Sequence, residues 1–174
     1  ANEAPAPHGG SYWPSAEPYS SETVVRAGPD YLRGYDSNER ERNRILVGVI
    51  RALLGEEAND IELTPAERAD LIAKYKSRLE GTGILDLTEF GRAVHAEMAA
   101  LMSCARSGVS PTRGTLFCTT FPCHNCAKHI LASGITKVVY VEPYPKSKAQ
   151  ALHADAICLP DEDDGTSDGR RVQF

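Results

Sequence analysis

Apolar residues recur at helical spacing in the stretch DSNERERNRILVGVIRALLG, which predicts the first long helix of the chain. Asp36 stands where a helix cap is needed, and Glu39 follows three residues later, as in a capping box. Gly55 marks the expected end of this helix. The expected buried stripe comprises Ile45, Leu46, Val49, Ile50, Leu53 and Leu54.

The motif TPAE predicts the start of a second amphipathic helix. Thr64 is a preferred capping residue, Pro65 suits the first helical position, and Glu67 closes a capping box. Gly81 and Gly83 are then expected to break the chain. The expected buried stripe of this helix comprises Leu71, Ile72, Tyr75 and Leu79.

From Glu89 onward the pattern changes to alternating helices and strands. A helix of small and apolar residues runs through AEMAALMSCARS and is expected to stop at Gly108. The elements expected after it are strands over 114–120 and 136–142 and helices over 124–133 and 147–155. Strands and helices that alternate at this spacing predict an α/β sheet with parallel neighbours.

Composition and charge narrow the class of protein. The 174 residues fit one domain, and the net charge is −5, with five acids and no base in segment 160–169, which predicts a solvated loop. Without a basic face, a nucleic-acid duplex is not the favoured partner. We expect no membrane span and see no signal-peptide pattern. Five cysteines, an odd number, favour a reduced cytoplasmic protein with a metal over a disulfide scaffold.

The residues that carry chemistry concentrate in the motifs HAE and PCHNC. Cys123 and Cys126 are three positions apart, so they share a face at the start of a helix, where the helix dipole stabilises thiolates. His95 supplies a third ligand, and a catalytic zinc takes three protein ligands and one water. The set predicts one Zn²⁺ per chain with a bound water. Glu97 is placed to carry a proton between this water and a leaving amine.

Two other interpretations of the cysteine pair are open at this point. A redox pair would leave His95 and Glu97 without a role. A structural zinc would need a fourth ligand. The candidates by residue type are His124, His129, Cys104 and Cys118. Of these, His129 is spaced to approach the site, whereas the two cysteines are expected to pack as small buried residues.

The segments HAEMAAL, TLFCTTFPCHNCAKHILASGI and KVVYVEPYP resemble the cytidine and deoxycytidylate deaminase superfamily, in its dCMP deaminase branch. They resemble still more the deaminase domain of bacterial anti-phage dCTP deaminases, which implies a role in antiviral defence. The resemblance is strong over residues 91–157 and weaker before them. It implies a three-layer α/β/α fold with a mixed sheet.

The resemblance also implies an activity and a set of site residues. A cytosine deoxynucleotide, dCMP or dCTP, would be hydrolysed at C4 to the uracil nucleotide and ammonia, with zinc on His95, Cys123 and Cys126 and proton transfer by Glu97. The substrate-binding candidates are Asn2 for the sugar hydroxyl, Ala96, and Tyr144 for the base or sugar. Arg26, Arg33 and Lys146 are phosphate candidates by charge alone, and Arg33 or Arg40 would meet the phosphates if the insert closes over the pocket.

We expect a single deaminase domain over 1–174, with a helical insert over 10–83, a catalytic core over 89–158 and an acidic tail over 159–174. The first helix and hairpin of the family are not found before Asn2, and no P-loop motif appears. A sheet without these strands would expose an edge. A further N-terminal segment, a partner chain or a homo-oligomer is therefore expected to complete it.

Three functions remain in competition. The first is a deaminase of free cytosine nucleotides, which the acidic balance and the long insert favour, because an insert of that size would wall the pocket. The second is a cytosine or adenine deaminase of RNA or single-stranded DNA, which needs an open groove. The third is a catalytically silent nucleotide-binding module, against which Glu97 argues.

Overall fold

The computed structural model describes residues 4–6, 9–12, 33–55, 63–159 and 172–174. The chain divides into two compact units, one formed by Ala1–Tyr12 with Val94–Phe174 and the other by Trp13–Ala93. The residue range of the second unit, 13–93, overlaps most of the insert that the sequence predicts over 10–83. The first unit holds the α/β elements and both the HAE and the PCHNC motifs.

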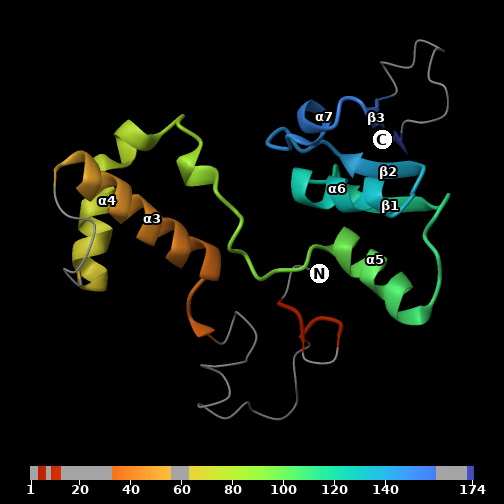
Figure 1. The fold of residues 1–174 in the computed structure, drawn as a ribbon, viewed down its shortest axis with the longest axis horizontal. Coiled ribbons are helices and arrows are strands. Elements are labelled where there is room, and N and C mark those ends of the chain that lie inside the picture. Colours follow the sequence, from red (N-terminus) through yellow and green to blue (C-terminus); the bar gives the residue numbers. More distant parts are fainter. Residues whose placement is uncertain (1–3, 7–8, 13–32, 56–62, 160–171) are drawn as a thin grey trace. The chain divides into compact units, whose positions relative to one another are not determined.

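The α/β unit is built on parallel strands in the order β1-β2-β4-β3. Figure 1 labels β1, β2 and β3. The strands are β1 (Thr115–Thr120), β2 (Lys137–Glu142), β3 (Ile157–Cys158) and β4 (Val172–Gln173). The helices are α5 (Ala96–Ser107), α6 (His124–Ala132) and α7 (Ala149–Leu152). The α/β class is thus confirmed. The antiparallel pairs of the expected mixed sheet are not seen among the strands of the described residues, because crossover helices connect β1 to β2 and β2 to β3.

The helices of this unit cover one face of the sheet. Leu116 of β1 and Val138 of β2 are register partners, and both are buried in one apolar cluster with Ile130 of α6. Successive residues of a strand point to opposite faces. Phe117 and Val141 therefore share the other face, where they are 74% and 81% exposed. Among the described residues, a helical layer over this second face is not present.

Residues 172–174, which the predicted acidic tail includes, form or adjoin a strand of the sheet. Val172 pairs with Ile157 and Gln173 with Lys137, so β4 lies between β2 and β3. Phe174 is 3% exposed and its ring lies 5.6 Å from that of Phe121. The acidic segment 160–169 itself lies outside the described residues.

The observed bounds of α5 and α6 agree closely with those expected from the sequence, whereas the bounds of α7 do not. α5 ends at Ser107 because Gly108 adopts a left-handed conformation with φ of 67°, as its sequence predicts. α6 ends one residue before the expected position. α7, expected over 147–155, spans only Ala149–Leu152, and Ser147 occupies the turn before it.

The second unit contains α3 (Ser37–Leu53), α4 (Pro65–Leu79) and the short 3₁₀ helix η1 (Ile84–Asp86). The Thr64–Glu67 capping box of α4 is confirmed in both directions. For α3, the Asp36 side chain accepts hydrogen bonds from the backbone N–H groups of Asn38 and Glu39, which confirms the predicted cap. None of the described helices is long and apolar enough to cross a membrane.

The buried face of α3 differs from the expected stripe. Leu46 and Ile50 are buried as expected, but Leu53 is 81% exposed and Val49 is 37% exposed. Arg51, in contrast, is 6% exposed. A helical period identifies which residues share a face, but whether another element covers the whole length of that face depends on the tertiary structure.

Two polar side chains in the first half of α3 hold the segment that leads toward the HAE motif. The Asn38 side chain donates to the Leu87 carbonyl at 2.7 Å and accepts from the Phe90 N–H at 3.2 Å. Arg42 donates from Nη1 to the Leu85 carbonyl at 2.9 Å. The segment after η1 is therefore fixed to α3 by side chains that satisfy its backbone.

Candidate metal centre and active site

Two of the three predicted zinc ligands occupy the N-cap positions of helices. His95 is the N-cap of α5 and Cys123 is the N-cap of α6, and neither side chain caps its own helix by a hydrogen bond. Histidine and cysteine are unusual here, since Ser, Thr, Asp and Asn are preferred at N-caps. Both helices therefore lack a side-chain cap at this position, and both side chains remain available as ligands.

The three ligand atoms converge at a distance that suits zinc. Sγ of Cys123 lies 3.4 Å from Nδ1 of His95, and Sγ of Cys126 lies 3.5 Å from the same nitrogen. All three atoms lie within 4.8 Å of one another. Zn–S and Zn–N bonds in a tetrahedron place sulfur and nitrogen about 3.6 Å apart. The donor set and its spacing therefore fit Zn²⁺ bound through His95 Nδ1.

The structure favours a three-ligand site over a structural zinc. Among the residues that the structure describes, the His/Cys/Asp/Glu cluster contains His95, Cys123 and Cys126 and no fourth member. His129, the best-spaced alternative, is exposed and lines an apolar groove of about 270 Å³ with Met98 and other residues of α5. Three protein ligands leave a coordination position for water or substrate, as in catalytic zinc sites.

Glu97 lies next to this cluster without belonging to it. It is in the first turn of α5 and is partly buried. The Glu97 carboxylate affects the pKa of two nearby thiols. Burial, and then the charge of Glu97, raise the pKa of Cys118 to about 11. Glu97 also makes a smaller contribution to the raised pKa of Cys126. Cys118 is half-buried in β1, with its Sγ 3.7 Å from the Val139 carbonyl. A carboxylate in this place is beside the metal position rather than on it.

The surroundings of the two predicted cysteine ligands favour a state in which they share one proton when no metal is bound. A hydrogen bond from the Cys126 thiol, followed by smaller contributions from the Cys126 backbone and His95, lowers the pKa of Cys123 to about 4. The same hydrogen bond, burial and the charge of the Cys123 thiolate raise the pKa of Cys126 far above its usual range. One thiolate and one thiol are the expected state at neutral pH.

This pairing predicts how zinc binding depends on pH. A metal needs both thiolates, so binding releases the proton that Cys126 holds. Cys123 is already ionised above pH 5 and adds no dependence near neutrality. The metal also needs a neutral imidazole at His95, so we expect the zinc affinity to rise by at least about tenfold per pH unit between pH 6 and 8.

Competition with a chelator of known affinity, repeated across this pH range, measures the dependence. Calorimetry in two buffers of different ionisation enthalpy counts the released protons directly. An affinity that does not change with pH would contradict the shared-proton state.

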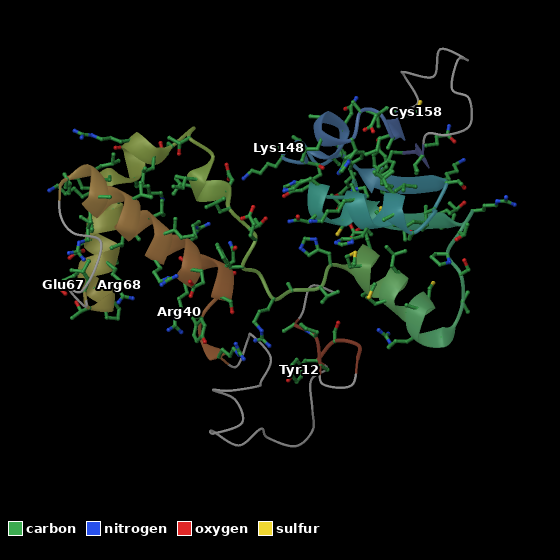
Figure 2. The ribbon with its side chains drawn as sticks, in the orientation of Figure 1. Tyr12, Arg40, Glu67, Arg68, Lys148 and Cys158 are labelled. Carbon is green, nitrogen blue, oxygen red and sulfur yellow. The ribbon has the colours of Figure 1, made fainter. Side chains whose placement is uncertain are left out.

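The predicted substrate-binding residues are distributed over both units. Ala96 is the first residue of α5 and is exposed, and Tyr144 follows β2 and is 39% exposed. Arg33 and Arg40 belong to the other unit, where the Arg40 guanidinium lies 5.0 Å from the centre of the Tyr35 ring. Figure 2 shows Arg40 projecting from α3. Asn2 and Arg26 lie outside the described residues. Lys146 is exposed in the turn after Tyr144.

Sequence reasoning missed the residue that connects this turn to the metal site. The Ser147 hydroxyl donates to the carbonyl of Pro122, directly before the ligand Cys123, at 2.8 Å. The sequence predicted Ser147 as the first residue of a helix over 147–155, and no local signal indicated that its hydroxyl would reach Pro122. The contact depends on the parallel pairing of β1 and β2, whose carboxyl ends meet at the same edge.

Residues 23–142 match the family model of the cytidine and deoxycytidylate deaminase zinc-binding region. This match spans more than half of the chain. The chain belongs to this family. Its cofactor is accordingly zinc, in agreement with the His/Cys/Cys cluster. The resemblance that the HAE and PCHNC motifs carry is confirmed.

Individual relatives within the deaminase family match a shorter part of the chain. The deoxycytidylate deaminases of the enterobacteria phages T2 and T4 are each 47% identical over 55 residues, which is 32% of this chain and 29% and 28% of theirs. The chain therefore spans less than a third of their length. A dCMP deaminase structure from the cyanophage S-TIM5, in complex with dCMP and dUMP, is 33% identical, with a TM-score of 0.34 over 40% of this chain and 54% of that one.

Proposed function

We propose that this protein hydrolyses the amino group from the cytosine of a deoxynucleotide, with dCMP as the first candidate substrate. The observation that carries the proposal is a three-ligand zinc site with Glu97 beside it and outside the ligand set. A purely structural zinc would use four protein ligands and would give a neighbouring carboxylate no task. The names of the phage relatives support a nucleotide substrate.

The proposed reaction assigns a task to each residue of the site. His95, Cys123 and Cys126 would hold the zinc ion, which would supply a Lewis acid that makes water a nucleophile near neutral pH. Glu97 would carry one proton of the attacking water to ring nitrogen N3 and the other to the departing amino group. The C4–O bond forms, the C4–N bond breaks, C4 becomes a carbonyl carbon and ammonia leaves. In this proposal Tyr144 contacts the base or sugar, Asn2 the sugar hydroxyl, and Arg33 and Arg40 the phosphates.

The wider features of the proposal rest on the sequence resemblance. The proposal includes dCTP as the alternative substrate, with a role in antiviral defence. It also includes a segment, partner chain or second copy that completes the sheet beyond β1. The exposed Phe117 and Val141 support a further layer over their face of the sheet, since exposed apolar side chains on a sheet favour a covering element. A cytoplasmic location is part of the proposal, supported by five free cysteines.

Ammonia release from a panel of substrates tests the proposed function. We expect the zinc-loaded protein to turn over dCMP or dCTP and to leave a cytosine-containing oligonucleotide unchanged. Deoxycytidine is expected to be a much weaker substrate, because it lacks the phosphates that charged side chains would bind. Activity confined to the oligonucleotide would replace the proposal with a polynucleotide deaminase. Nucleotide binding without ammonia release would indicate a silent binding module.

A further inference from the structure

Ser147 lies at the centre of a small hydrogen-bond network. Its hydroxyl donates to the Pro122 carbonyl at 2.8 Å and accepts from the Ala149 N–H at 3.2 Å. Its own N–H donates to the Tyr144 carbonyl at 2.9 Å, which closes a four-residue turn. One side chain thus joins the turn after β2, the start of α7 and the segment that enters α6.

The Pro122 carbonyl is the group that makes this contact necessary. Pro122 is among the fully buried side chains of the protein, and proline has no N–H, so its carbonyl is its single backbone polar group. A buried carbonyl needs a partner, and Ser147 provides it. On the other side of Pro122, the Phe121 N–H donates to the Glu142 carbonyl at 2.8 Å. The approach to Cys123 is therefore held from both sides by the chain at and after the end of β2.

The same turn carries side chains suited to substrate. Tyr144 opens the turn, and Lys148 follows Ser147 and extends from the loop before α7 (Figure 2). Parallel strands place ligand-binding groups at their carboxyl ends. β1 ends three residues before Cys123 and β2 ends two residues before Tyr144, so the metal ligand and the turn leave the sheet at the same edge.

We propose that Ser147 is a positioning residue, which holds the Tyr144 turn against the backbone that presents Cys123 and thereby sets the distance between the substrate-contacting turn and the metal site. This inference rests on the proposed deaminase function. Without the hydroxyl, the buried carbonyl loses its partner and the turn loses its anchor. The metal ligands themselves remain, so substrate placement is affected more than zinc binding.

The test compares Ser147→Ala with Ser133→Ala. Ser133 is a matched control, since it is also half-buried and its hydroxyl donates to a carbonyl, that of Ile130, at 2.7 Å, but at the opposite end of α6. We expect Ser147→Ala to raise the KM for the nucleotide about tenfold, with kcat changed less and zinc content unchanged. Ser133→Ala is expected to leave KM within twofold of the parent value, and Ser147→Thr, which keeps the hydroxyl, is expected to restore it.

Hydrogen exchange gives a readout that does not need activity. Ser147→Ala should speed amide exchange in both 121–127 and 143–149, whereas Ser133→Ala should speed it only near the end of α6. A parent protein that releases no ammonia would contradict the proposed function. Hydrogen exchange would still test whether Ser147 holds the turn against the segment that leads to Cys123. Unchanged exchange in 121–127, or an equal KM rise in the two alanine variants, overturns the inference. If Ser147→Ala fails to fold, Ser147→Cys, with its weaker donor, decides by the same criteria.

Discussion

Replacing Glu97 with Gln is expected to lower the kcat for nucleotide deamination by about 10²–10⁴-fold, which is the usual contribution of a general acid–base group. Gln has nearly the shape and hydrogen-bonding reach of Glu, but it cannot carry a proton from water to a leaving amine. Zinc content and thermal unfolding should be unchanged, because Glu97 does not belong to the ligand cluster. Steady-state ammonia release, elemental analysis and calorimetry of the purified variant measure the three quantities.

Glu80→Gln serves as the control for the Glu97 variant. Glu80 is exposed at the end of α4, so the same chemical change there should leave kcat at the parent value. A Glu97→Gln variant that also lost its zinc would assign Glu97 to metal binding. Turnover at the parent rate would remove it from the proposed reaction.

Replacing Cys126 with Ala is expected to reduce bound zinc from one ion per chain to nearly none and to abolish activity. Cys126 supplies one of three protein ligands, and its Sγ lies 3.5 Å from His95 Nδ1. Even changes to residues that only support metal ligands typically weaken affinity about 10–100-fold, and loss of a ligand should cost more. Metal content after dialysis, together with the rise in unfolding temperature on adding zinc, measures the loss.

Cys158→Ala provides a matched comparison for the Cys126 variant. Cys158 is 6% exposed and Cys126 is 2% exposed, so both substitutions remove a buried thiol. Cys158 lies in β3 and is not a member of the ligand cluster. We expect it to keep one zinc per chain and the zinc-dependent rise in unfolding temperature. Equal zinc loss in both variants would attribute the effect to general unfolding.

The local signals of the sequence predicted individual helices well. Thr64 and Glu67 begin α4 through a reciprocal capping box, and Gly108 ends α5 in a left-handed conformation. These signals succeed because capping and chain reversal depend on a few neighbouring residues. The predicted ligands His95, Cys123 and Cys126 are brought together by the fold, and their roles as a catalytic site, with Glu97, remain predictions that the experiments above test.

Contacts between distant parts of the chain could not be predicted in this way. Val172 and Phe174 belong to the buried core, although they follow ten residues with five acids and read as the end of a polar tail. Two-residue strands carry too little alternation to be recognised. Similarly, Leu53 belongs to the predicted stripe of α3 but is exposed, since periodicity does not reveal where a covering element ends.

The sequence by itself determined which residues are of the types that hold zinc and that the fold is of the α/β class. It also determined where α4 begins and where α5 ends. Each of these depends on local chemistry and spacing. Only the tertiary structure decided that β4 enters between β2 and β3, that both N-caps present ligands instead of capping, and that Ser147 reaches the Pro122 carbonyl. The physical reason is that strand order and side-chain contacts arise from packing among residues far apart in the chain, which no local pattern encodes.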